Sequence, residues 1–257
     1  MYLEKYDLSG RTAVVTGGGQ GIGFACAQAL GEAGARVIVG ELDPARGADA
    51  KQRLVALGID AHAELLDVTK SSQVDEVARK VERDFGGADI LVNNAGVAKS
   101  DVAAEDTSDD HWHFHMDVNL HGVFWCCRDF GRHMLARGKG AIVNVGSMSG
   151  MIVNKPQPQS FYNASKAAVH HLTRSLAAEW GERGVRVNAV APTYVETPLT
   201  VFGMQDQEMA EVWLNMTPMK RVGQPEEIGS VVLFLASDAS SLMTGSIVVA
   251  DGGYTCW

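Results

Sequence analysis

Residues 12–23 read Thr12-Ala13-Val14-Val15-Thr16-Gly17-Gly18-Gly19-Gln20-Gly21-Ile22-Gly23. A short apolar, β-branched run leads through a glycine-rich turn into a helical pattern, which predicts a strand–turn–helix unit. Glycines let a backbone approach a pyrophosphate, and a helix N-terminus offers free N–H groups and a positive dipole end. The turn therefore predicts a dinucleotide site that includes Gly17, Gln20, Gly21, Ile22 and Gly23, although its G-x-x-x-G-x-G spacing differs from G-x-G-x-x-G.

Beyond this turn, short apolar runs alternate with longer helical patterns along the whole chain. Several runs are continuously apolar, as in strands buried on both faces of a parallel sheet. We expect a single-domain, doubly wound (Rossmann-type) α/β fold of about seven parallel strands with helices on both faces. The expected strands are Thr12–Val15, Val37–Val39, Ala61–Leu66, Ile90–Val92, Ala141–Val145, Arg186–Val190 and Ile247–Val249. Expected helices include Ile22–Ala33, Ser71–Phe85, Trp112–Ala136, Tyr162–Arg183 and Pro225–Ala236.

The composition restricts the class of protein and of partner. The 257 residues carry a net charge of −9, which argues against nucleic acid and anionic membranes as partners. No apolar run approaches the roughly 18 residues that a membrane helix needs, and the N-terminus shows no secretory h-region. The four cysteines show neither a disulfide framework nor metal-ligand spacing. We therefore expect a cytoplasmic protein with reduced thiols and no metal at the active site.

Glu41 ends the second expected strand, 18 residues beyond Gly23 and near the acidic position expected about 20 residues on. Its carboxylate could accept hydrogen bonds from the adenosine ribose and would repel a 2′-phosphate. This favours NAD over NADP as the cofactor. The alternative is that Glu41 is a solvated loop charge and that Asp43 or Arg46 matters more.

Two further strand ends carry candidate cofactor contacts. Asp67 and Val68 follow the third strand, where a carboxylate could reach the adenine amino group. Asn94, Ala95 and Gly96 follow the fourth strand, where small residues would let a cofactor lie against the backbone.

Tyr162 and Lys166 are the candidate catalytic pair. Residues i and i+4 share one face of a helix, so an ammonium would lie near a phenol. A nearby positive charge lowers the pKa of a phenol, which would make Tyr162 a general acid/base near neutral pH. Ser147 follows the fifth strand and is placed to hydrogen-bond a substrate oxygen. Asn119 interrupts a helical pattern where asparagine is unfavourable, which suggests a local distortion that holds a water on a proton path.

Over essentially its whole length the chain resembles the short-chain dehydrogenase/reductase family. The turn Thr16–Gly23, Asn93–Gly96, Asn119, Ser147, Tyr162 with Lys166, and Asn188–Pro192 occur in the family's order. The resemblance implies a tetrad in which Tyr162 exchanges the proton, Lys166 also binds the nicotinamide ribose, Ser147 orients the reacting oxygen and Asn119 holds a relay water. It implies hydride transfer between a substrate carbon and the nicotinamide.

One departure from the family pattern follows the sixth strand. The family usually has Pro-Gly there, whereas this chain has Pro192-Thr193. Threonine takes a positive φ only at a cost, so this loop could be shaped differently. Val195 and Thr197 still match positions that contact the nicotinamide carboxamide in the family, and Pro192 is a further cofactor-binding candidate. We expect the irregular stretch 193–215 to be a loop with a short helix and a lid over the substrate.

The segment Ser147–Gln157 predicts the substrate class. Ser149, Asn154 and Gln157 could bond substrate hydroxyls, together with Ser147 and Tyr162, unless they cap the loop and face water. This segment and the C-terminal residues 251–257 resemble the polyol (sugar-alcohol) dehydrogenases of the family. A first alternative is an NADP(H)-dependent reductase of a 3-oxoacyl or bulkier ketone, favoured by apolar residues such as Phe202 and Trp213. A remote alternative is a catalytically inactive cofactor-binding protein.

Four other features concern histidines, metals and assembly. His111 and His115 share a helix face but lack a third ligand, so we expect a solvated helix start, and His170-His171 reads as an exposed or interface pair. Some relatives in the family hold a structural magnesium ion near the C-terminal carboxylate. The sequence does not decide whether this chain does so. The family also implies a homotetramer, and Val123, Phe124, Val169, Leu172 and Leu176 would permit such packing or equally fit a monomer core.

Overall fold

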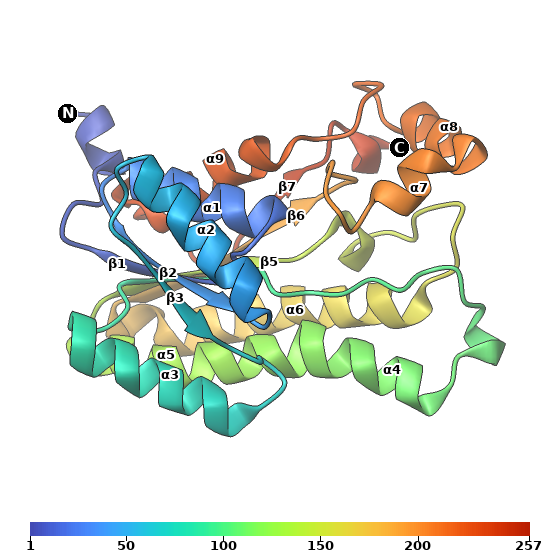
Figure 1. Ribbon diagram of the computed structural model, residues 1–257. Helices are drawn as coiled ribbons and strands as arrows, with labels where there is room; N and C mark the ends of the chain where they lie inside the picture. Colours follow the sequence, from blue (N-terminus) through green and yellow to red (C-terminus); the bar gives the residue numbers. More distant parts are fainter.

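The computed structural model describes residues Met1–Trp257. Seven parallel strands form one sheet in the order β3-β2-β1-β4-β5-β6-β7 (Figure 1). The strand order reverses between β1 and β4, and this is where open α/β sheets bind their ligands. The strands are β1 Thr12–Thr16, β2 Arg36–Glu41, β3 Ala61–Leu65, β4 Ile90–Asn93, β5 Gly140–Val145, β6 Val185–Pro192 and β7 Ile247–Ala250. The predicted fold class is confirmed, and each expected strand is present.

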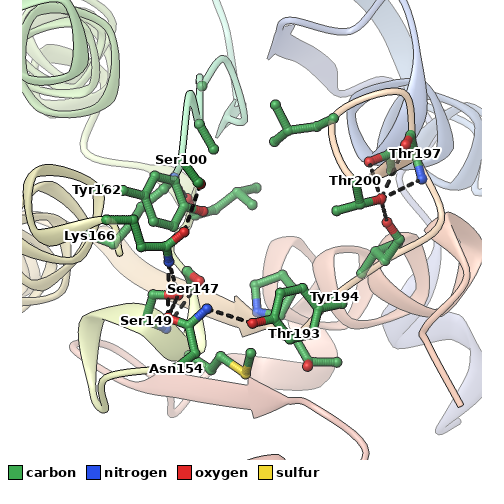
Figure 2. A pocket seen from close by; sticks show the side chains of 18 of the residues that line it. Ser100, Ser147, Ser149, Asn154, Tyr162, Lys166, Thr193, Tyr194, Thr197 and Thr200 are labelled. Atoms are coloured by element: carbon green, nitrogen blue, oxygen red, sulfur yellow. Dashed lines mark hydrogen bonds between the residues drawn. The ribbon is translucent and has the colours of Figure 1, made fainter. Parts of the chain in front are cut away.

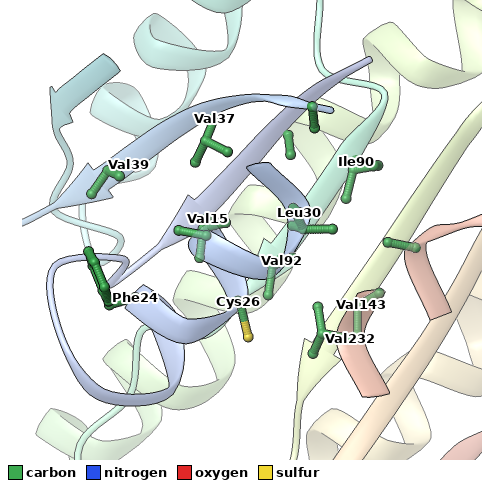
Figure 3. Close-up of a cluster of buried hydrophobic side chains, with 14 of the residues drawn as sticks. Val15, Phe24, Cys26, Leu30, Val37, Val39, Ile90, Val92, Val143 and Val232 are labelled. Atoms are coloured by element: carbon green, nitrogen blue, oxygen red, sulfur yellow. The ribbon is translucent and has the colours of Figure 1, made fainter. Parts of the chain in front are cut away.

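Helices cover both faces of the sheet, and each face has its own apolar core. On one face α1, α2 and α9 pack on the strands around Val15, Leu30 and Val232 (Figure 3). On the other face α3, α5 and α6 pack around Val14, Phe130 and Trp180. These helices and α4 are α1 Gly21–Glu32, α2 Pro44–Ala56, α3 Ser71–Phe85, α4 Asp109–Met116, α5 Gly122–Arg137, α6 Ser160–Trp180 and α9 Pro225–Ala236.

The expected helix 112–136 is interrupted around Asn119, the residue at which the sequence predicts a distortion. Between α4 and α5 the chain forms a π-helical turn over Asp117–His121, with Asn119 at its centre and fully buried. Single π-turns inside α-helices occur frequently at functional sites. The predicted distortion at Asn119 is therefore confirmed.

The stretch 193–215 contains two short helices where one was expected. These are α7 Val201–Gln205 and α8 Gln207–Met216, which lie at one end of the molecule near the C-terminus (Figure 1). The Asp206 side chain accepts a hydrogen bond from the Met209 amide and so caps α8. Whether this stretch opens and closes as a lid stays a prediction.

Candidate active site

A pocket opens at the carboxyl ends of β4, β5 and β6. Figure 2 shows Tyr162, Lys166 and Ser147 on one side of it and Thr197 and Thr200 on the other. It brings together the predicted residues Ile22, Asn94, Gly96, Ser147, Ser149, Asn154, Gln157, Tyr162, Lys166, Pro192, Val195 and Thr197. The remaining predicted residues do not line it; these are Gly17, Gln20, Gly21, Gly23, Glu41, Asp67, Val68, Ala95 and Asn119.

Tyr162 and Lys166 are neighbours, but the expected effect on the phenol is wrong in direction. The Lys166 Nζ lies 5.7 Å from the centroid of the Tyr162 ring and donates to the Val145 carbonyl at 2.8 Å. Burial raises the pKa of Tyr162, and a hydrogen bond with Ser147 opposes this only in part. Burial also lowers the pKa of Lys166 to about 8. Desolvation is therefore the dominant influence on the Tyr162 pKa.

Ser147 sits on a turn that His170 supports. Its Oγ accepts a hydrogen bond from the Ser149 amide at 3.1 Å, and its own N–H points at the His170 Nε2 at 3.5 Å. His170 is 4% exposed, which makes the expectation of an exposed pair wrong for this residue, whereas His171 is exposed. Burial, with the charges of Lys166 and Arg174, lowers the pKa of His170 to about 4, so it is neutral at physiological pH.

Asn119 braces the loop that follows β4. Its Oδ1 accepts from the Val97 amide at 2.8 Å, and its Nδ2 donates to the Val97 carbonyl at 2.9 Å and to the Ser165 Oγ at 3.2 Å. Ser165 in turn donates to the Tyr162 carbonyl. The side chain thus connects the pocket loop to the catalytic helix, and its role toward a relay water stays a prediction.

The glycine turn is shaped as a dinucleotide cradle. Gly17 and Gly21 have φ of +60° and +54°, which glycine adopts without strain. A Cβ on Gly23 would lie 2.1 Å from the Gly17 carbonyl oxygen, so only glycine fits there. Asn94 fixes the turn by donating to the Thr16 and Gly17 carbonyls. The backbone is left bare in front of the α1 N-terminus, so the residues present fit a pyrophosphate.

Glu41 is part of this cradle and is not a solvated charge. It is 7% exposed, and its Oε2 accepts from the Gly19 amide at 3.1 Å. Arg46 forms ion pairs with Glu41 and with Asp43, each at 3.5 Å, so both residues of the alternative lie beside Glu41. Asp67 accepts from the Thr69 amide and hydroxyl, while Val68 is buried beside Gly122. Contact of Asp67 or Val68 with the adenine stays a prediction.

The polar wall of the pocket is buried and linked internally, so the reading in which it faces water is wrong. Asn154 Oδ1 accepts from the Ser149 hydroxyl at 2.9 Å, and its Nδ2 donates to the Tyr194 hydroxyl at 2.7 Å (Figure 2). Gln157 Nε2 also donates to Tyr194, and its Oε1 accepts from the Trp213 indole.

Tyr194 is the main pocket residue that the sequence did not indicate, and it packs against Trp213, which the sequence had suggested only as an apolar contact. Their rings stack with centroids 3.7 Å apart, which joins the end of β6 to α8. Gln159 was missed as well; it donates to Asn154 at 2.9 Å. Tyr194 lies between Thr193 and Val195, which were both considered, but its contacts are all distant in sequence and left no local signal.

The Pro192-Thr193 departure does not strain the backbone. The non-glycine residues with positive φ are Asp101 and Lys220, so Thr193 keeps an ordinary conformation. Its amide donates to the Ala250 carbonyl at 3.3 Å, which continues the β6–β7 pairing. The Thr193 hydroxyl is buried without a hydrogen-bond partner at the pocket.

The solvated helix start expected at His111 and His115 is wrong for His115. This residue is fully buried against Phe161, with ring centroids 4.3 Å apart. No cluster of three or more His, Cys, Asp or Glu side chains could hold a metal ion. No helix combines the length and the apolar composition of a membrane span.

Comparisons with known proteins agree with this geometry. A sequence model described as enoyl-(acyl carrier protein) reductase matches residues 17–255. A galactitol 2-dehydrogenase from Rhizobium johnstonii is 55% identical, and the match covers 100% of this chain and 99% of that protein. The chain belongs to the short-chain dehydrogenase/reductase family.

Two further members of the family are similar over the whole chain. A galactitol 2-dehydrogenase (L-tagatose-forming) from Cereibacter sphaeroides is 49% identical, with 100% of this chain and 99% of that protein covered. A gluconate 5-dehydrogenase from Burkholderia cenocepacia J2315, solved in complex with NADP and tartrate, has a TM-score of 0.95 at 35% identity and full coverage of both chains. The chain is thus an oxidoreductase that uses a nicotinamide cofactor.

Proposed function

We propose that this protein is an NAD-dependent polyol dehydrogenase that oxidises a secondary hydroxyl of a hexitol to a ketone, and runs the reverse reaction. One observation carries the proposal: the Tyr162 hydroxyl and Ser147 share a pocket with a buried wall of amides and hydroxyls. Two relatives at 55% and 49% identity bear the name galactitol 2-dehydrogenase, which supports a hexitol as substrate.

In the proposed mechanism Ser147 and Tyr162 hold the reacting oxygen. The bound nicotinamide supplies the hydride acceptor or donor. Tyr162 takes the proton from the alcohol during oxidation and returns it to the oxygen during reduction. Lys166 stabilises the phenolate electrostatically and binds the nicotinamide ribose, while Asn119 holds the pocket loop and the helix of Tyr162 in register. Gly17, Gly21 and Gly23 cradle the pyrophosphate.

The polar wall has free hydrogen-bonding capacity for a polyol. Asn154 and Gln157 each donate one amide N–H to the Tyr194 hydroxyl, and their amide oxygens accept from other side chains. Each side chain therefore has a second N–H that can donate to a substrate. We assign these N–H groups, with the Ser149 hydroxyl, to the hydroxyls that flank the reacting carbon. A site with buried donors discriminates against substrates that leave them unpaired.

Glu41 supports NAD as the preferred cofactor. Its buried carboxylate lies at the Gly19 amide, where a 2′-phosphate would bring a second negative charge into contact. Arg46 beside it weakens this repulsion, and one relative of 35% identity was solved with NADP. We expect Glu41→Ala to lower kcat/KM with NAD and to reduce the preference for NAD over NADP. A native enzyme that already favours NADP would contradict this assignment.

We also propose self-association, with a homotetramer as the assembly, in the cytoplasm. Val123, Val169 and Leu176 are buried in the monomer core and Leu172 packs against it, whereas Phe124 is 37% exposed on α5. Trp257 is exposed and anchored by its indole N–H on the Met216 carbonyl. All four cysteines are free, which fits a reducing compartment.

The substrate test is a panel of compounds followed by NADH absorbance. Galactitol, other hexitols, a monohydric secondary alcohol and a 3-oxoacyl ester would be compared by kcat/KM with each nicotinamide cofactor. We expect the hexitols to be the best substrates. Higher kcat/KM for the 3-oxoacyl ester would favour the alternative reductase, for which Leu199, Phe202 and Trp213 provide an apolar side of the pocket.

A further inference from the structure

His115 is a fully buried histidine in which both ring nitrogens make defined hydrogen bonds. The Nδ1 lies 2.8 Å from the His111 carbonyl oxygen, and the Nε2 lies 3.0 Å from the Lys99 amide nitrogen. A carbonyl oxygen can only accept, so Nδ1 carries a proton. A backbone amide can only donate, so Nε2 is bare. The two contacts together require the neutral ring and fix its tautomer.

The Lys99 amide belongs to the loop that Asn119 also binds. Asn119 is four residues after His115 and pairs with both backbone groups of Val97. The segment from α4 into the π-helical turn therefore holds residues 97–99 by hydrogen bonds at two points, one from His115 and one from Asn119; we call this pair of contacts the clamp. Val97 and Ala98 line the active-site pocket beside the catalytic residues. The mechanism proposed above gives His115 no role, so its two directed hydrogen bonds call for another explanation.

We propose that His115 is a positioning residue, which together with Asn119 holds the loop 97–99 over the active site and releases it when the imidazole is protonated. A protonated ring would present an N–H at Nε2 to the N–H of Lys99, and two donors cannot bond each other. The loop would then lose one of the two contacts of the clamp. This inference concerns the pocket of any substrate and does not depend on which polyol is oxidised.

The surroundings of His115 favour its neutral form. Burial lowers its pKa, and the facing His111 and Lys99 lower it further against the opposing bond to the His111 carbonyl. These are the titratable or charged groups that face the ring, from α4 and from the loop. Helix α6 contributes the uncharged ring of Phe161. The clamp is thus intact at neutral pH and opens as the pH falls below the ordinary range of histidine.

The native protein gives the first test. Hydrogen exchange of the Lys99 amide, corrected for its intrinsic pH dependence, should show strong protection at neutral pH that declines in mild acid while β4 stays protected. Nitrogen NMR of labelled histidine should show one ring with a proton on Nδ1 and none on Nε2. Equal protection of Lys99 at both pH values, or a proton on the His115 Nε2 at neutral pH, would overturn the proposal.

Three variants give the second test, with a hexitol that the native enzyme oxidises or any ketone that it reduces. His115→Leu removes the acceptor and should raise KM about tenfold, the effect of one lost hydrogen bond, with kcat changed far less. His115→Gln offers an amide oxygen that cannot titrate and should restore KM and flatten its rise in acid. His113→Gln, on the exposed side of α4, is the matched control and should behave as the native enzyme.

The outcomes separate this inference from the proposed function. Native KM in His115→Leu, or a rise of KM in acid that His115→Gln retains, would overturn the positioning role. Failure of all hexitols would overturn the proposed substrate and leave the exchange measurement on Lys99 to decide the role of His115. If a variant does not fold, that same measurement on the native chain decides it.

Discussion

At the scale of single residues, the phenol of Tyr162 experiences two opposing effects, burial and the hydrogen bond with Ser147. Because burial dominates, the phenol is protonated at neutral pH and ready to give its proton to a ketone. We expect Tyr162→Phe to lower kcat by about 10²–10⁴-fold in both directions, since a general acid/base contributes that much. NADH binding, followed by fluorescence titration, should be nearly unchanged.

The same residue predicts the pH dependence of the two directions. Oxidation needs the phenolate, and the raised pKa of Tyr162 means that this form gains population as the pH rises. The kcat/KM for alcohol oxidation should therefore increase into the alkaline range, whereas ketone reduction should be favoured at neutral pH. Initial rates in the two directions against pH would check this. An oxidation rate that falls from neutral to alkaline pH would contradict the assignment of Tyr162 as base.

At the scale of elements, the first βα turn depends on a close approach between Gly23 on α1 and the carbonyl of Gly17. Gly23→Ala would place a Cβ 2.1 Å from that oxygen, and the helix would have to move away from the turn. We expect the variant to lose NADH binding and to unfold at lower urea concentration. Calorimetric titration with NADH and urea unfolding would measure the two effects.

A matched glycine provides the control for this element. Gly181 follows α6 with a φ of −56°, and no atom lies within 4 Å of the Cβ that alanine would add. Gly181→Ala should keep NADH binding and leave stability unchanged or raised by about 0.4–1 kcal/mol, because alanine restricts the unfolded chain. Equal loss of binding in both variants would show that the close approach at Gly23 is not the cause.

At the scale of the whole molecule, apolar periodicity and the glycine turn were enough to predict the sheet, because buried parallel strands leave continuous apolar runs such as 13–15 and 90–92. The i, i+4 spacing likewise placed Tyr162 beside Lys166. These are local signals, and the fold preserves them.

The predictions that proved wrong concern properties that only tertiary packing sets. The Tyr162 pKa depends on burial and on the hydrogen bond with Ser147, 15 residues away in sequence. The burial of His115 and His170 depends on residues far away in sequence. The internal pairing of the polar wall depends on Tyr194, whose partners Asn154 and Gln157 lie about 40 residues earlier.

These buried histidines also make the stability of the folded molecule depend on pH. His170 has a folded pKa of about 4 against an ordinary value of 6.5. A lowered pKa means that the unfolded chain binds more protons between these two values. The contribution of His170 to stability is therefore fully present above about pH 6.5 and is lost as the pH falls toward 4. The shift corresponds to about 3 kcal/mol. His115 contributes with the same sign.

Urea unfolding of the native protein at about pH 7 and about pH 5 should therefore show a clear loss of unfolding free energy in acid. His170→Gln lowers stability at neutral pH through lost packing against Gly146 and Gly150, but it removes one titrating group, so its loss between the two pH values should be smaller. The exposed neighbour gives the control, because His171→Gln should keep the native pH dependence. An undiminished loss in His170→Gln would mean that the carboxylates and His115, rather than His170, drive unfolding in acid.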